Sequence, residues 1–176
     1  MMLQADVREI VRSVLCKGLS AAQADQIVKA TVPVQIAAGH AVLHEGDASG
    51  GLYLLLRGEV EIVKRGADGT PQSLGTIGAP TVLGEMSLIT ARPHSATVAA
   101  VTECDFALLT RSQFERLIAS ESLAAYKLVA TIAEVLAGRV ARLDAKVLEL
   151  SSRQDCPPPV GELAAFQRKL FSEWSF

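Results

Sequence analysis

The chain has 176 residues, of which 17 are basic and 19 acidic, so its formal net charge is −2. This balance disfavours nucleic-acid binding, because proteins that neutralise phosphates usually carry an excess of Lys and Arg. Apolar residues make up 49% of the chain and charged residues 20%, a composition too apolar for a disordered segment. The length fits one compact domain with an appendage.

Cysteine spacing and the N-terminal region indicate the cellular compartment. Cys16, Cys104 and Cys156 lie far apart and form no CxxC or Cys/His cluster, so we expect neither a disulfide framework nor a zinc site. Charged residues interrupt the first ten positions, where a secretory peptide needs an apolar core. No run approaches the roughly eighteen apolar residues of a membrane span. The sequence therefore predicts a soluble cytoplasmic protein with no membrane association.

Residues 1–30 are predicted to form two helices. Apolar residues recur at helical spacing between Ala5 and Cys16. Ser20 followed by Gln23 has the form of a capping box, which predicts that a second helix begins there.

Residues 31–110 have the pattern of β structure, with short apolar or alternating runs separated by glycine. The segment Ala67-Asp68-Gly69 carries the Asp-Gly signature of a hairpin turn. The stretch around Gly78 and Pro80 is expected to be irregular. About eight short strands at this spacing are typical of a sandwich or jelly-roll barrel. The predicted strands are Thr31–Ala37, Ala41–His44, Leu52–Arg57, Val60–Arg65, Thr70–Thr76, Ser95–Val101 and Asp105–Thr110.

Residues 111–150 are predicted to be helical, with a short helix capped by Ser112 and then a long proline-free helix. The long helix carries a narrow apolar stripe whose spacing averages close to 3.5 residues, as in a coiled coil. Its members are Val129, Ile132, Leu136, Val140, Leu143, Val147 and Leu150. We therefore expect a homodimer formed through residues 121–150; the alternative is that this helix folds back on its own barrel.

Residues 151–176 begin with a proline-rich break at 157–159. In the tail, residues 160–176, apolar side chains at Leu163, Phe166, Leu170 and Trp174 predict an amphipathic helix. This helix is expected to dock on its own domain or to bind a protein partner.

The densest motif is Leu83 to Val98. It places a glycine and a carboxylate, Gly84 and Glu85, before a short apolar helical turn and a polar loop that leads into a strand. Backbone N–H groups at the start of such a turn are free to meet an anion, and the carboxylate can accept from hydroxyls. The pattern is compatible with a ligand that joins a phosphate to a sugar.

Two ordered blocks of the sequence carry a resemblance. The first is Gly39–Asp47 followed by Leu52–Val60, and the second is Gly84–Thr97. Together they resemble the cyclic-nucleotide-binding domain family, which includes catabolite activator proteins and the regulatory subunits of cyclic-AMP-dependent kinase. The resemblance covers residues 18–150. It implies a mainly β fold with flanking helices: an eight-stranded jelly-roll β-barrel with N-terminal helices, a phosphate-binding cassette at residues 83–97 (the cassette below) and a long C-terminal dimerisation helix.

The resemblance also implies which residues would meet a ligand such as cAMP or cGMP. Glu85 matches the glutamate that accepts from the ribose 2′-hydroxyl, and the backbone N–H groups of Gly84 to Leu88 match those that hold the cyclic phosphate. The candidate ligand-binding residues are Leu83, Gly84, Glu85, Met86, Ser87, Leu88, Arg92, His94, Ser95 and Ala96.

His94 departs from the family pattern, which has arginine after the cassette proline. Arginine offers a permanently charged fork to two phosphate oxygens, whereas histidine offers one directed donor. Loss of a charge-assisted hydrogen bond weakens binding by about one to two orders of magnitude. Three outcomes remain open: cyclic-nucleotide binding assisted by Arg92 or His94, binding of a different anion, or no small ligand.

The sequence carries no signature of catalysis or metal binding. Nucleophile motifs such as Gly-x-Ser-x-Gly do not occur, and His40 and His44 have no second pair of ligands beside them. We expect neither enzymatic activity nor a cofactor. DNA binding is also not expected, since the 26 residues after Leu150 are too few for a helix-turn-helix domain.

The sequence thus predicts a stand-alone regulatory module that senses a cyclic nucleotide and signals through altered dimer or partner contacts. The alternative is a scaffold that keeps the same fold and binds a protein partner without a nucleotide.

Overall fold

A computed structural model describes residues 4–15 and 19–153 of the chain. The chain divides into two units, Met1–Ala133 and Glu134–Phe176, and the boundary falls inside the last described helix. The first unit holds all the strands found in the described residues. The predicted tail, the proline-rich break, Cys16 and Cys156 lie outside the described residues.

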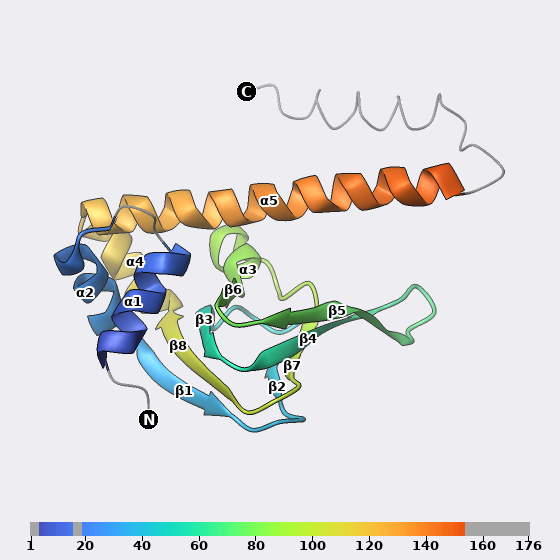
Figure 1. The fold of residues 1–176 in the computed structure, drawn as a ribbon, viewed down its shortest axis with the longest axis horizontal. Coiled ribbons are helices and arrows are strands. Elements are labelled where there is room, and N and C mark those ends of the chain that lie inside the picture. The colour runs from blue at the N-terminus through green and yellow to red at the C-terminus, as the bar shows by residue number, and fades with distance from the viewer. Residues whose placement is uncertain (1–3, 16–18, 154–176) are drawn as a thin grey trace. The chain divides into compact units, whose positions relative to one another are not determined.

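Eight strands form two four-stranded antiparallel sheets. The strands are labelled in Figure 1. Phe106 and Leu55 of the first sheet and Val60 of the second are almost fully buried in the core between the sheets. Phe106 also packs edge-on against Tyr53, with ring centroids 6.0 Å apart. In spatial order the first sheet comprises β1 (Val32–Ile36), β8 (Cys104–Thr110), β3 (Gly51–Arg57) and β6 (Thr81–Leu83), and the second β2 (Ala41–Leu43), β7 (Thr97–Ala100), β4 (Glu59–Arg65) and β5 (Pro71–Gly78). The predicted mainly β, jelly-roll type of fold is confirmed, as two sheets rather than one continuously hydrogen-bonded barrel.

One strand was not predicted. β6 lies directly after Gly78 and Pro80, in the stretch expected to be irregular. Three residues are too few to show a period of their own; the segment is a strand because Tyr53, Leu54 and Leu55 of β3 pair with it. The predicted hairpin turn between β4 and β5 is confirmed, with Gly69 at φ 80° and the Asp68 carboxylate accepting from the backbone N–H of Thr70.

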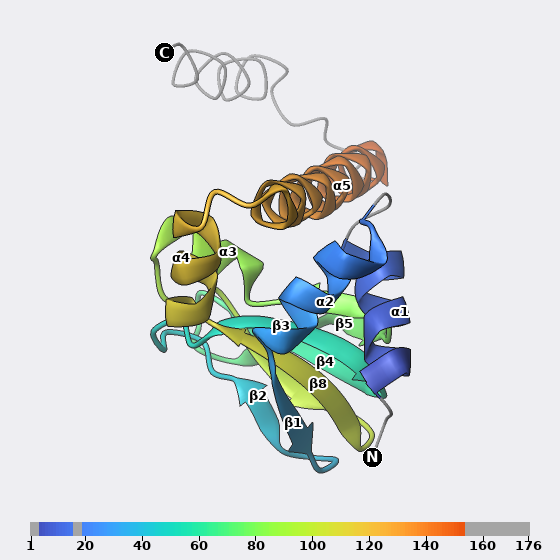
Figure 2. The same cartoon turned by 90° about the vertical axis from the view of Figure 1, so that its left-hand side faces the viewer.

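Five helices accompany the sheets in the described residues (Figure 2). α1 and α2 contact each other, and α1 also contacts β3. Ser20 caps α2: its hydroxyl accepts from the N–H of Gln23, whose side chain accepts from the N–H of Ser20, so the predicted capping box is confirmed. The bounds are α1 Gln4–Leu15, α2 Ala21–Lys29, α3 Glu85–Thr90, α4 Arg111–Ala119 and α5 Leu123–Arg153. No helix in the described part of the chain is long and apolar enough to cross a bilayer.

The predicted cap of α4 was wrong by two residues. Thr110, not Ser112, begins the helix, and its hydroxyl accepts from the N–H of Gln113 while the Gln113 side chain accepts from the N–H of Thr110. Ser112 has the same spacing to Glu115. Thr110 prevails because it is the last residue of β8 and keeps the extended backbone (φ −63°, ψ 158°) that an N-cap requires.

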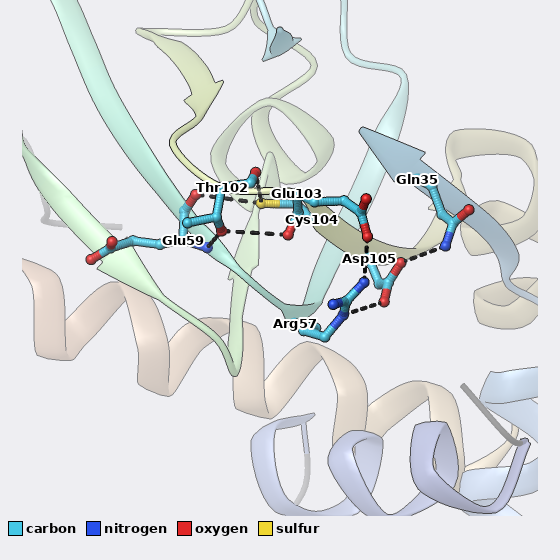
Figure 3. Close-up of polar contacts among 7 residues, drawn as sticks. All are labelled: Gln35, Arg57, Glu59, Thr102, Glu103, Cys104 and Asp105. Carbon is cyan, nitrogen blue, oxygen red and sulfur yellow. Dashed lines mark hydrogen bonds and ion pairs between the residues drawn. The ribbon is translucent and has the colours of Figure 1, made fainter. Parts of the chain in front are cut away.

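A charged network joins β1, β3 and β8 where β8 begins (Figure 3). The Asp105 carboxylate, 8% exposed, accepts from Arg57 Nε at 2.7 Å and from Gln35 Nε2 at 2.8 Å. Arg57 also donates to Glu103 at 2.6 Å. The hydrogen bond from Arg57 is the main cause that lowers the pKa of Asp105. The network therefore favours the charged form of Asp105 in the folded state.

We predict that Asp105→Asn lowers the free energy of unfolding by about 1 kcal/mol at pH 7. Because the folded-state pKa of Asp105 lies below its ordinary value of 3.8, this stabilisation is present above pH 4 and is lost as the pH falls through the folded-state pKa. Urea unfolding of both proteins from pH 7 to pH 3 measures the difference. Glu103→Gln, at the more exposed partner of Arg57, is the matched control and should change stability less. A difference between wild type and Asp105→Asn that does not shrink at low pH would contradict this assignment.

Candidate functional site

The cassette begins at Gly84, between β6 and α3. Gly84 has φ 80°, a left-handed conformation that favours glycine. A Cβ atom at this position would lie 2.7 Å from the carbonyl oxygen of Gly51, at the start of β3. Only a residue without a side chain allows the cassette to approach the sheet this closely.

The short helix α3 is amphipathic. Glu85, Ser87 and Leu88 are buried, whereas Met86 and Ile89 are exposed. Buried carboxylate and hydroxyl groups are unusual on the inner face of a helix, because a polar group removed from water needs a partner inside the protein. The inner face of α3 is therefore built for polar contacts as well as for packing.

Arg111, the first residue of α4, contacts the middle of α3. Its guanidinium donates to the backbone carbonyls of Ser87 at 3.3 Å and Leu88 at 3.4 Å, and it contacts the Glu115 carboxylate at 3.4 Å. Sequence reasoning missed this residue. It lies far along the chain from the cassette, and no local pattern indicates the contact.

His94 lies inside the protein at the end of the cassette. Its side chain is 6% exposed, and Nδ1 lies 2.9 Å from the hydroxyl oxygen of Ser87. The backbone N–H of His94 donates to the carbonyl of Asp47, and its carbonyl accepts from the N–H of Gly46, both at 2.9 Å. Gly46 and Asp47 belong to the first sequence block, which the structure thus joins to the second.

Burial favours the neutral form of the His94 ring. Removal of the ring from water lowers the pKa of His94 below its ordinary value of 6.5, and the Asp47 carboxylate acts more weakly in the opposite direction. His94 therefore does not reproduce the permanent charge of the arginine that the family pattern has at this position.

The predicted site residues fall into two groups. Gly84, Ser87 and His94 come together, with Cε1 of His94 3.7 Å from the position of a Cβ on Gly84. Leu83, Glu85 and Leu88 are buried beside them in the chain, and Ala96 is half-buried. The second group is exposed and comprises Met86, Arg92 and Ser95.

Arg92 is exposed and lies two residues before His94. Its side chain forms no hydrogen bond or ion pair with any residue in 4–15 or 19–153; the backbone N–H alone donates, to Thr90 Oγ1. Ser95 approaches Met86, with its hydroxyl 4.0 Å from the sulfur.

Comparison with known proteins decides the family. Residues 33–121, half of the chain, match the family model described as "Cyclic nucleotide-binding domain". The chain belongs to this family. The match includes both sequence blocks, all of the cassette and α4, so the sequence resemblance is confirmed.

Relatives of the cyclic nucleotide-binding domain occur in proteins of different kinds. The chain is 26% identical over 141 residues to the CRP-like cAMP-activated global transcriptional regulator of Mycobacterium tuberculosis, covering 80% of this chain and 61% of that protein. It is 34% identical over 84 residues to lysophospholipase nte1 of Aspergillus oryzae, covering 48% of this chain and 6% of that enzyme. This chain thus spans less than two thirds of the length of these curated relatives.

One solved structure resembles this chain over most of the length of both proteins. It is a cyclic nucleotide-binding domain from Methylobacillus flagellatus KT, with a TM-score of 0.77 and 25% sequence identity. The likeness covers 87% of this chain and 86% of that one.

We predict that Gly84→Ala destabilises the protein by about 3 kcal/mol, because the left-handed backbone and the close Gly51 carbonyl both oppose a side chain. Gly69→Ala is the matched control: Gly69 has the same φ of 80°, but a Cβ there would meet nothing within 4 Å. It should cost about 1 kcal/mol. Chemical unfolding measures both, and equal losses would show that the approach to Gly51 has no energetic weight.

Proposed function

We propose that this protein is a regulatory module whose cassette binds a cyclic nucleotide such as cAMP or cGMP. The observation that carries the proposal is the cassette itself, which brings Gly84, Ser87 and His94 together and keeps Glu85 buried next to them. Membership of the cyclic nucleotide-binding domain family supports the same ligand class. Relatives named as cAMP-activated or cAMP-dependent regulators agree with it.

The ribose and the cyclic phosphate of the nucleotide each have a proposed partner. The resemblance assigns the ribose 2′-hydroxyl to the Glu85 carboxylate, and the cyclic phosphate to backbone N–H groups between Gly84 and Leu88. His94 stands where the family pattern has a permanent cation, so one neutral donor replaces an ion pair. We therefore expect weaker binding than an arginine would give, by about one to two orders of magnitude.

We propose that a conformational change caused by ligand binding passes from the cassette to the helices that follow the sheets. Arg111 supports this proposal, because it is the first residue of α4 and its guanidinium donates to backbone carbonyls of α3. A ligand that moves α3 would change these hydrogen bonds, and it would favour one arrangement of α4 over another.

A homodimer formed through α5 is the proposed signalling state. Within the second unit, the stripe residues Val140, Leu143 and Val147 are 57%, 62% and 42% exposed. Large apolar side chains repeated at coiled-coil spacing on one helix face are costly to leave in water. A second copy of the same helix would cover them.

A second candidate function is a scaffold that binds a protein partner without a nucleotide. The observation that favours it is the burial of His94, which lowers the pKa of the ring and so leaves the phosphate without a permanent cation at this position. The ligand measurement below separates the two candidates.

We predict that isothermal titration calorimetry detects binding of cAMP or cGMP to the full chain. Glu85→Gln should weaken binding at least tenfold, because it removes the charged acceptor for the ribose hydroxyl. Glu134→Gln, an exposed carboxylate of the second unit, is the control and should bind as wild type does. Absence of binding by the wild type would favour the scaffold, and wild-type affinity of Glu85→Gln would remove Glu85 from the site.

We also predict that Leu143→Glu converts a dimer into a monomer, because a charge in the seam costs at least about 2 kcal/mol on burial. Ala145→Glu, about half a turn away on the same helix, is the matched control and should leave the dimer intact. Sedimentation equilibrium of the full chain measures both. A wild-type monomer, or equal effects of the two substitutions, would contradict a dimer formed through this stripe.

A further inference from the structure

The contact between Ser87 and His94 joins two residues of the cassette by their side chains. The Ser87 hydroxyl oxygen lies 2.9 Å from Nδ1 of His94, and the two residues are 2% and 6% exposed. A hydroxyl can donate or accept, and a neutral imidazole carries its proton on either nitrogen. Two arrangements are therefore compatible with the distance.

Burial selects between these arrangements. If Nδ1 carried the proton and donated, the hydroxyl hydrogen of Ser87 would need another acceptor. Within residues 4–15 and 19–153, Ser87 Oγ has no hydrogen-bond partner besides His94. A buried hydroxyl without an acceptor is costly. Nε2 is not among the fully buried side-chain atoms that lack a partner in the described residues, so a proton on Nε2 can reach water. Ser87 therefore donates to Nδ1. The imidazole proton is then on Nε2.

The His94 ring lies beside the start of the cassette. Cε1, which is bonded to both ring nitrogens, lies 3.7 Å from the position of a Cβ on Gly84. Nε2 forms no hydrogen bond with the described residues. It is thus the ring nitrogen that remains for a ligand beside Gly84.

We propose that Ser87 is a positioning residue, which fixes His94 as the Nε2–H tautomer so that a neutral, directed N–H donor meets a phosphate oxygen of the nucleotide. The donation to a ligand rests on the proposed function, whereas the tautomer is a property of the protein alone. Ser87 and His94 act as a pair, and the hydroxyl has no such role when position 94 is arginine, whose protons are fixed.

Nitrogen-15 NMR of the ligand-free full chain at pH 7.5 tests the tautomer directly, since the two imidazole nitrogens differ in chemical shift according to which one is protonated. A His94→Gln spectrum identifies the His94 signals among the three histidines. We expect the Nε2–H form in wild type and in Ser87→Thr, and a mixture of both forms in Ser87→Ala. A wild-type Nδ1–H form, or an unchanged spectrum in Ser87→Ala, would overturn the proposal.

Calorimetry with cAMP tests the pairing through a double-mutant cycle. Ser87→Ala should weaken binding about three- to tenfold when His94 is present, and less than twofold in the His94→Arg background. Ser87→Thr should restore the affinity, and Ser87→Cys, with a weak S–H donor, gives a second variant of similar size. Ser73→Ala, which removes an exposed hydroxyl from β5 outside the cassette, is the control.

The outcomes separate this proposal from the proposed function. Equal losses from Ser87→Ala in both backgrounds would show a packing role and overturn the pairing. Wild-type protein that has the Nε2–H tautomer but binds neither cAMP nor cGMP would overturn the proposed function and the donation to the ligand, with the tautomer assignment intact.

Discussion

A close approach of three backbone segments holds the cassette in place. The carbonyl of Gly51 on β3 lies against Gly84, where it leaves no room for a side chain. A Cβ on Gly51 would in turn collide with the backbone of Leu109 and Thr110, at the end of β8. Two glycines therefore allow the cassette, β3 and β8 to lie directly against one another. Any side chain at either position would separate α3 from the sheet that supports it.

The same approach connects the cassette to α4. Thr110 ends β8 and caps α4, and Arg111 then donates back to the carbonyls of α3. The contacts run from Gly84 through Gly51 and Thr110 to Arg111 and return to Ser87, so α3 is tied to the junction of β8 and α4 at its start and again at its middle. A movement of the cassette would reach α4 through these backbone contacts and through the hydrogen bonds of the Arg111 side chain.

The charge at position 94 distinguishes this chain from the family pattern described above. At this position His94 places a buried ring whose neutral form is favoured where the family pattern has a permanent cation. The Ser87 hydroxyl forms a hydrogen bond with Nδ1, one of the two ring nitrogens. Neutral hydrogen bonds are weaker than charge-assisted ones but depend less on salt.

Local patterns in the sequence were enough to predict most elements, because capping boxes, alternating runs and helical spacing are read within a few residues. The Ser20–Gln23 box and the Asp68-Gly69 turn are of this kind. β6 and the contacts of Arg111 depend on pairing with distant segments, which leaves no local signal. The sequence identified His94 as a departure from the family, but its burial and its contact with Ser87 required coordinates.

The central claim is that this cassette binds a cyclic nucleotide without a cationic partner from position 94. Thermal unfolding of the full chain with increasing cAMP or cGMP tests this claim most directly. A ligand at one hundred times its dissociation constant stabilises the folded state by about 2.7 kcal/mol. The account predicts a Tm that rises steadily with nucleotide concentration and rises equally at low and high salt. A Tm that does not change at millimolar concentrations of either nucleotide would contradict it.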